Sequence, residues 1–108
     1  MSLHERKCIP CEKGAVPLKG DKLKELYKEL NLEWKLIDEH HLLREYKFKN
    51  FKEALDFTNT IGHLADKENH HPDINLSWGK VTITIYTHKI DGLSEADFVL
   101  AAKYDHLS

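Results

Sequence analysis

Residues 80–87 alternate strictly in polarity, and this pattern constrains the fold more than any other feature of the chain. Odd positions from 81 to 85 are Val or Ile, and even positions from 82 to 86 are Thr or Tyr. Because successive side chains of a strand point to opposite faces, the pattern predicts a β-strand with one buried face. Gly79 separates it from another strand-like stretch at residues 74–78, so we expect a hairpin.

A second hairpin is predicted upstream, at residues 34–38 and 41–48, with a tight turn around Glu39 and His40. In residues 42–48, apolar and long side chains at even positions alternate with Leu43, Glu45 and Lys47. The two sets therefore lie on opposite faces, which predicts a half-buried antiparallel pair.

Three helices are predicted around these hairpins. After Asp21, leucines and a tyrosine recur at helical spacing as far as Leu30, which indicates a short amphipathic helix. The main helix begins at Asn50 and runs to residues 67–69, because Pro72 disfavours helical geometry at the residue before it. We expect this main helix to be central to the core. A last helix follows Ser94 and carries the apolar residues Ala96, Val99, Leu100 and Tyr104.

The order helix, two strands, helix, two strands, helix predicts an α+β fold, with a four-stranded antiparallel sheet and helices packed on one face. The length of 108 residues fits a single domain over residues 1–108. Residues 1–20 contain Pro and Gly without an apolar period, so we expect an extended or loosely held arm. So small a sheet leaves edge strands and an open face, which favours a homodimer or homotetramer.

Composition excludes several classes of function. Lys and Arg number 16 against 18 Asp and Glu, for a net charge of -2, so no basic surface predicts direct binding to nucleic acid. No apolar run approaches the roughly 18 to 20 residues that span a bilayer, and no signal peptide is apparent, so we expect a cytoplasmic protein. Cys8 and Cys11 form a lone Cys-x-x-Cys pair, which is half of a zinc site or a redox dithiol. Because no completing feature is visible, we interpret them as two unligated thiols.

Three histidines are candidates for chemistry. His70 and His71 follow the main helix, whose terminal carbonyls favour a protonated imidazole that suits a general acid. His88 ends the last strand, and a hairpin of this length brings it to the same sheet edge. Imidazoles in different protonation states can move protons in both directions. A zinc site is the competing use of three histidines, although adjacent side chains on extended backbone diverge.

Other polar residues have plainer interpretations. Asp97 lies three residues after Ser94, so a capping-box role is at least as well supported as direct chemistry. The five remaining histidines are interpreted as surface residues: His4, His40, His41, His63 and His106.

The spacing of these residues resembles the pterin-4a-carbinolamine dehydratase family. The motif is carried by Asp66, His70, His71, Pro72, Trp78, His88 and Asp97. The resemblance implies dehydration of 4a-hydroxytetrahydropterin to the quinonoid dihydropterin, in tetrahydropterin recycling, with no metal and no cofactor. It implies that His70 and His88 are the catalytic acid/base pair and that His71 mainly holds the substrate. The implied substrate-binding set is Asn69, His70, His71, Tyr86, Thr87, His88, Lys89 and Asp97.

Two positions depart from the family pattern. Asn69 stands where many members carry Asp, which removes a charge beside the histidines. Tyr86 replaces a smaller residue typical of animal members and is expected to reshape the pocket mouth. Two alternatives remain open at this point. One is a non-catalytic dimerisation or protein-binding module of the same fold, because animal members also serve as dimerisation cofactors of a homeodomain transcription factor. The other is a metal-binding protein that uses the cysteines and histidines.

Overall fold

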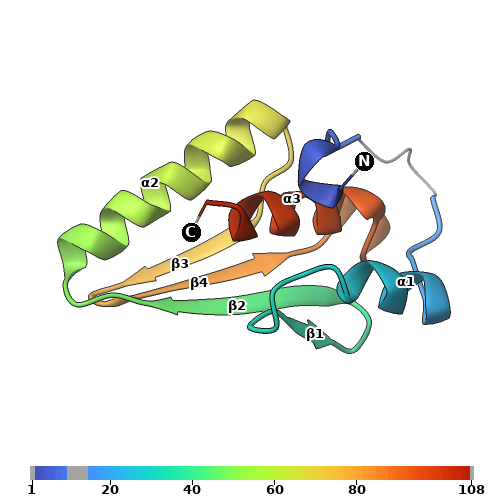
Figure 1. The fold of residues 1–108 in the computed structure, drawn as a ribbon, viewed down its shortest axis with the longest axis horizontal. Coiled ribbons are helices and arrows are strands. Elements are labelled where there is room, and N and C mark those ends of the chain that lie inside the picture. The colour runs from blue at the N-terminus through green and yellow to red at the C-terminus, as the bar shows by residue number, and fades with distance from the viewer. Residues whose placement is uncertain (1, 10–14, 108) are drawn as a thin grey trace.

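The computed structural model describes residues 2–9 and 15–107. Helices and strands follow the predicted order α-β-β-α-β-β-α (Figure 1). With η for a short 3₁₀-helix, their bounds are η1 Leu3–Glu5, α1 Gly20–Tyr27, β1 Lys35–Ile37, β2 His41–Lys47, α2 Phe51–Glu68, β3 Asp73–Ser77, β4 Lys80–Ile85, η2 His88–Ile90 and α3 Glu95–Asp105. The predicted fold class is therefore confirmed.

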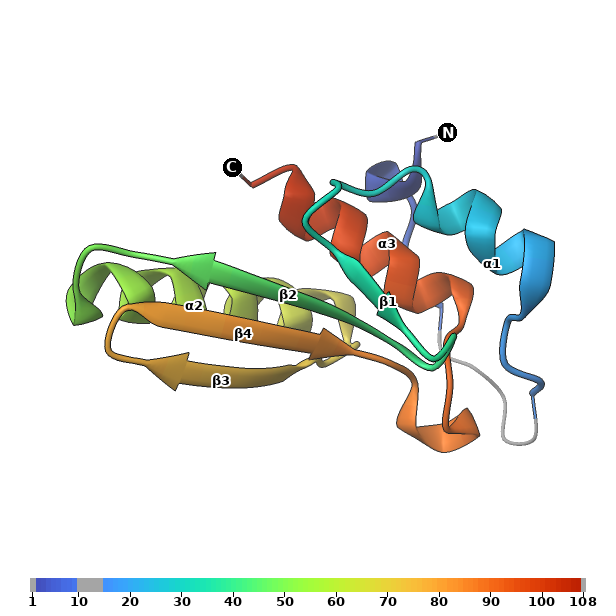
Figure 2. The ribbon, with the colours of Figure 1, turned by 90° about the horizontal axis from the view of Figure 1, so that it is seen from below.

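The four strands form one antiparallel sheet in the order β1-β2-β4-β3, so the two predicted hairpins join through β2 and β4. The helices lie on one side of this sheet (Figure 2). Val81, Ile83 and Ile85 of β4 are fully buried on that side. The register places Leu42 opposite Ile85, which aligns the alternation of the two strands. Strand β4 ends at Ile85, two residues earlier than predicted, and His88 begins the short turn η2 instead of ending the strand.

Helix α3, and not α2, is the central helix of the core. Its buried residues are Ala96, Asp97, Phe98, Val99, Leu100, Ala101, Ala102 and Tyr104. Helices η1, α1 and α2 all contact α3, so it is covered on several sides. In α2 only Ala54, Ile61 and Ala65 are buried, while Phe51 and Leu55 are 44% and 37% exposed. The expectation that α2 is central was wrong, because α2 covers the sheet with one face and leaves the other in solvent.

Residues 1–20 were expected to form an extended or loosely held arm. In its described part, residues 2–9 and 15–19, most side chains are exposed or half-buried, but some of them pack against the core. Leu3 in η1 is 2% exposed and contributes to the core, and Cys8 is 9% exposed. Further along, the Leu18 N–H donates to the Leu93 carbonyl at 2.8 Å. Apolar burial without helical periodicity explains why the sequence pattern did not reveal this packing. Cys11 lies outside the described residues. Among the described residues, no helix is both long and apolar enough to cross a membrane.

Candidate functional site

The end of α2 delivers the two adjacent histidines to the sheet. Asn69 ends the helix in the left-handed conformation, with φ 53° and ψ 39°. The His70 N–H donates to the Ala65 carbonyl and the Asn69 N–H to the Asp66 carbonyl, each at 3.2 Å, which is the Schellman pattern of helix termination. Asn tolerates left-handed geometry better than most residues. Asn69, which departs from the family pattern, therefore also makes the turn that ends α2.

A short loop after β4 carries the third histidine. The Thr87 N–H donates to the Gly92 carbonyl at 2.8 Å, which closes the loop around η2 and places His88 at its start. A Cβ at Gly92 would lie 2.6 Å from the Cβ of Pro17, closer than real Cβ contacts come. Any other residue at position 92 would therefore force the loop or the N-terminal segment that passes over it to shift.

These two segments enclose a pocket of about 330 Å³. Its lining residues are Asn69, His70, His71, Tyr86, Thr87, His88 and Lys89. The sequence therefore identified every residue that lines this pocket, and the three histidines do share one cleft. Asp97, the remaining predicted member, lies behind the lining as a fully buried side chain. A volume near 300 Å³ is at the lower end of the range for small-molecule sites.

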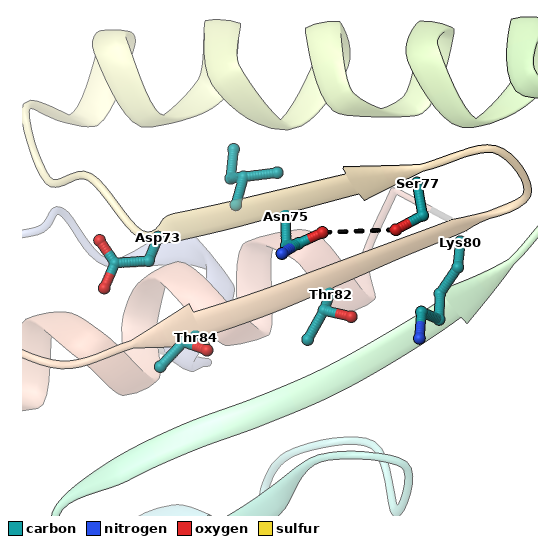
Figure 3. Close-up of a pocket in the computed structure, with 7 residues that line it drawn as sticks. Asp73, Asn75, Ser77, Lys80, Thr82 and Thr84 are labelled. Atoms are coloured by element: carbon teal, nitrogen blue, oxygen red, sulfur yellow. Dashed lines mark hydrogen bonds between the residues drawn. The ribbon is translucent and has the colours of Figure 1, made fainter.

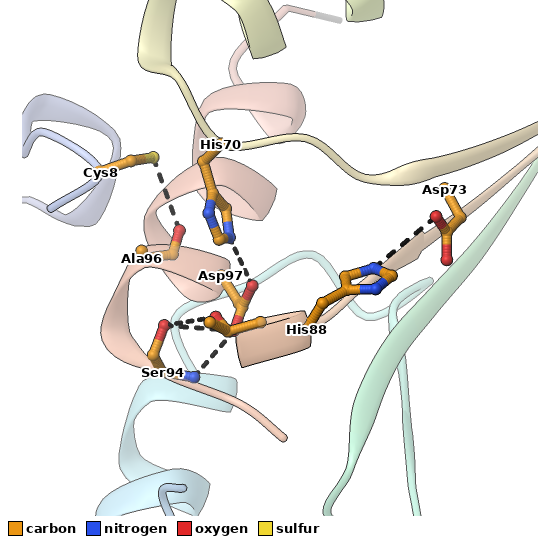
Figure 4. A network of polar contacts seen from close by, with 8 residues as sticks. Cys8, His70, Asp73, His88, Ser94, Ala96 and Asp97 are labelled. Carbon is orange, nitrogen blue, oxygen red and sulfur yellow. Dashed lines mark hydrogen bonds and ion pairs between the residues drawn. The ribbon is translucent and has the colours of Figure 1, made fainter. Parts of the chain in front are cut away.

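A buried carboxylate holds His70. The His70 Nε2 lies 2.6 Å from Asp97 Oδ1, and the two side chains are 15% and 0% exposed (Figure 4). Asp97 Oδ2 accepts hydrogen bonds from the Ser94 N–H and the Thr87 hydroxyl, each at 2.8 Å. The predicted capping box between Ser94 and Asp97 is confirmed. Asp97 thus caps α3 and orients His70 at the same time.

The contact with Asp97 determines which His70 nitrogen carries the hydrogen. A carboxylate only accepts hydrogen bonds, so the Nε2 of His70 carries the hydrogen in this pair. In the neutral imidazole the remaining nitrogen, Nδ1, is then the acceptor. A fixed tautomer of this kind is what a proton-transfer residue requires from its partner.

The other two histidines have exposed carboxylate partners. His71 Nε2 lies 2.8 Å from Asp66 Oδ1, with side chains 56% and 80% exposed. His88 Nε2 lies 3.8 Å from Asp73 Oδ1, too far for a hydrogen bond but within ion-pair distance. The sequence analysis missed Asp73, although its position directly after His-His-Pro at the start of the adjacent strand was a usable signal. Each pocket histidine therefore faces one carboxylate.

Tyr86 is the aromatic residue of the pocket lining, and the turn before β2 contacts it. The Tyr86 ring stacks on His88, with centroids 4.2 Å apart and planes 18° apart. It also contacts His40, at a centroid distance of 4.8 Å. His40 was interpreted as a surface residue, and its proximity to the pocket comes from the pairing of β2 with β4. In contrast, Trp78 of the motif is 68% exposed in the β3–β4 turn, at the other end of β3 from the pocket.

The open face of the sheet carries a second, larger polar hollow of about 520 Å³ (Figure 3). Its lining includes Asp73, Asn75, Lys80, Thr82 and Thr84. Only Asp73 connects it to the histidines, through the contact with His88. This hollow therefore lies beside the histidine pocket and is not part of it.

Cys8 lies behind the buried part of the site. Its thiol contacts the Ala96 carbonyl at 3.6 Å, one residue before Asp97 (Figure 4). Burial raises the pKa of the Cys8 thiol to about 12, and the Glu68 carboxylate adds to the rise. A thiol of this kind is protonated and unreactive at neutral pH. Within the described part of the chain, no group of three His, Cys, Asp or Glu side chains is arranged to hold a metal ion.

The fold and the pocket together define a small α+β protein with three histidines in the lining of one pocket. The sequence model of the pterin 4 alpha carbinolamine dehydratase family matches residues 16–107. The chain therefore belongs to the pterin-4a-carbinolamine dehydratase family, a family of hydro-lyases, as the motif predicted.

Relatives and a solved structure agree with this assignment. A protein of Alkaliphilus metalliredigens is 64% identical over 104 residues, which cover 96% of this chain and 94% of the relative. A protein of Rubrobacter xylanophilus is 55% identical, with 97% of each chain covered. Both carry the name pterin-4-alpha-carbinolamine dehydratase as a provisional assignment. The crystal structure of a transcriptional coactivator/pterin dehydratase from Brucella melitensis matches with a TM-score of 0.76 and 28% identity, over 84% of this chain and 97% of that one.

Proposed function

We propose that this protein dehydrates 4a-hydroxytetrahydropterin to the quinonoid dihydropterin by histidine general acid/base catalysis. The observation that carries the proposal is that His70, held by buried Asp97, and His88 line one pocket. Family membership and the names of the relatives support the choice of reaction. Asn69 and Lys89, which also line the pocket, offer polar groups to a heteroaromatic ring.

The reaction needs two proton transfers and no oxidant. One imidazolium gives a proton to the 4a-hydroxyl, so that the carbon–oxygen bond breaks and water leaves. The other imidazole accepts the proton of a ring nitrogen, whose electron pair then forms the new carbon–nitrogen double bond. His70 and His88 supply these two groups, and exchange of one proton between the pair and solvent restores the starting states. His71, whose partner Asp66 is exposed, holds the substrate.

The proposed function also includes a pathway, a cellular compartment and an oligomeric state. A dehydratase of this kind serves the recycling of a tetrahydropterin cofactor, and we place it in the cytoplasm. We propose a homodimer or homotetramer, because β3 is an edge strand of the sheet and α2 exposes Phe51 and Leu55.

A second candidate function is a non-catalytic dimerisation or protein-binding module. It is favoured by the likeness to the Brucella protein, which is named a transcriptional coactivator as well as a pterin dehydratase. The exposed apolar residues of α2 are the surface that such a module would use. The two candidates differ in what the histidines do, since only the enzyme needs their proton transfer.

The test is a stopped-flow measurement of the dehydration of chemically generated 4a-hydroxytetrahydropterin. We expect His70→Ala and His88→Ala each to lower kcat by about 10²- to 10⁴-fold, the usual contribution of a positioned acid or base. His106→Ala is the matched control, because His106 stacks on His4 at the other end of α3 from Asp97. Folded variants that dehydrate the substrate as fast as wild type would refute the mechanism. A folded wild type without activity would favour the binding module.

A further inference from the structure

We propose that the turn between β1 and β2 is a positioning element for His88, which it holds through His40 and Tyr86. The inference rests on the proposed function for the catalytic role of His88, but not for the contacts themselves. The juxtaposition that carries it is a chain of rings: His40 contacts Tyr86 at 4.8 Å, and Tyr86 stacks on His88 at 4.2 Å. His40 lies outside the family motif and does not line the pocket.

The sheet register brings these distant segments together. Leu42 at the start of β2 pairs with Ile85 at the end of β4, so the residues before Leu42 lie beside the residues after Ile85. His41 and Tyr86 are consequently neighbours, with ring centroids 6.4 Å apart. The β1–β2 turn therefore reaches the loop that carries His88.

His40 makes two polar contacts, one of them with an exposed carboxylate. Its Nε2 lies 2.8 Å from Asp91 Oδ1, and its Nδ1 lies 3.0 Å from His41 Nδ1. Because the carboxylate only accepts, Nε2 carries the hydrogen, and Nδ1 of a neutral His40 accepts the hydrogen of His41. Asp91 directly follows η2, which begins with His88. His40 thus reaches the His88 loop twice, once through Tyr86 and once through Asp91.

The backbone of the turn is a second, independent observation. Asp38 and Glu39 both have left-handed backbone angles, with φ of 53° and 55°. Such angles suit a tight hairpin turn, but residues with a Cβ seldom adopt them. Asp tolerates such angles better than most residues, but Glu does not, so the chain accepts backbone strain at Glu39 in the turn that presents His40. Strain of this kind is often retained where geometry matters to function.

His88 needs a positioning element more than His70 does. His70 is fixed by a hydrogen bond to a fully buried carboxylate. The His88 side chain is 59% exposed, and Asp73 is 3.8 Å away and 61% exposed. An exposed imidazole without a close hydrogen bond can turn among its rotamers. The nearly parallel face of Tyr86 restricts that rotation, and His40 restricts Tyr86.

The first arm of the test is independent of activity. In the NMR spectrum at about pH 8, where an unperturbed imidazole is neutral, the His88 ring proton Hε1 is assigned by its loss in His88→Gln. Stacking on Tyr86 shifts this signal through the ring current, and we expect Tyr86→Leu to abolish the shift and Tyr86→Phe to retain it. His40→Ala should reduce it, whereas His40→Phe, which keeps a ring but loses the contact with Asp91, should reduce it less.

The second arm separates positioning from binding. Because His40 does not line the pocket, His40→Ala should lower kcat by about three- to tenfold while KM changes less than twofold. His106→Ala is again the matched control, expected to leave kcat, KM and the His88 signal unchanged. A folded His40→Ala protein with wild-type kcat and an unmoved His88 signal would overturn the proposal. If the signal moves as expected but the wild type has no dehydratase activity, the contacts stand and the proposed function fails.

Discussion

His70 and His71 are adjacent in the chain and each faces an aspartate, yet the two pairs lie in opposite environments. His70 and Asp97 are 15% and 0% exposed, whereas His71 and Asp66 are 56% and 80% exposed. The His71 contact is only 0.2 Å longer, at 2.8 Å against 2.6 Å. Distance alone therefore does not distinguish the pairs.

Burial and shared hydrogen bonds decide how much a histidine–aspartate pair contributes to stability and how firmly it holds the imidazole. Asp97 also accepts hydrogen bonds from Ser94 and Thr87, so its removal would leave several buried donors without an acceptor. Asp66 is surrounded by water, and an exposed ion pair contributes little free energy. The same two residue types thus give a fixed His70 and an exposed, more adaptable His71, and the proposed mechanism assigns proton transfer to the first and substrate holding to the second.

The largest effect is expected from removal of the buried carboxylate. Asp97→Ala should lower the free energy of unfolding by about 3 kcal/mol, because buried donors lose their acceptor. It should also lower kcat by about 100-fold or more, since His70 loses its orientation. Asp97→Asn keeps the shape, so it should cost less stability for a comparable loss of kcat. Urea unfolding and stopped-flow kinetics measure the two quantities, and equal effects of Asp97→Ala and Asp66→Ala would break the comparison.

A smaller effect is expected at the turn that sends the two histidines to different environments. Asn69→Ala should lower the free energy of unfolding by about 1 kcal/mol, because Ala pays a steric cost in the left-handed conformation that Asn69 adopts. Asn69→Gly is the matched control and should stay within about 0.5 kcal/mol of wild type, because Gly has no Cβ to clash. Thermal and urea unfolding report both values. The proposed role of Asn69 in ending α2 fails if Ala is as stable as Gly.

Alkaline pH probes the buried region behind His70. The pKa of Cys8 rises from 9.0 to about 12 in the folded protein, so the unfolded chain loses this proton first. The contribution of the Cys8 thiol to the free energy of unfolding is therefore fully present below pH 9 and is lost as the pH rises toward 12. At pH 10 the loss is about 1 kcal/mol. Burial also raises the pKa of Tyr46 to about 12, which adds a decline above pH 10.

Cys8→Ala isolates the thiol. Between pH 8 and 10 the variant should show a flatter decline in the free energy of unfolding than wild type, since only the thiol is missing. Identical slopes in the two proteins would show that the Cys8 thiol does not have a raised pKa in the fold.

The smallest effect is expected for the exposed pair. Asp66→Asn should change the free energy of unfolding by less than about 0.5 kcal/mol, because water already solvates the carboxylate. If His71 holds the substrate, KM should rise by about twofold with kcat nearly unchanged, as for a loss of uniform binding. High salt should reduce the difference from wild type. A large loss of kcat would show that the exposed pair also takes part in chemistry.

Much of the site could be predicted because its residues are encoded locally. Pro72 ends the helix that precedes it, and the alternation in residues 80–87 identifies the buried face of β4. The contacts that give these residues their roles span long distances in the sequence, such as 27 residues between His70 and Asp97 and 51 between His40 and Asp91. No local sequence pattern predicts side-chain contacts between residues so far apart in the chain.

The sequence by itself determined the order of elements, the faces of the strands, the end of α2 and the capping box of α3, because periodicity and capping act within a few residues. Only the tertiary structure decided that α3 is the central helix and that Asp97 is shared between a cap and His70. It also decided that Cys8 is buried and that His40 contacts Tyr86 of the pocket lining. These outcomes depend on how helices and strands pack in space, and a polar residue's burial is settled only when distant segments cover it.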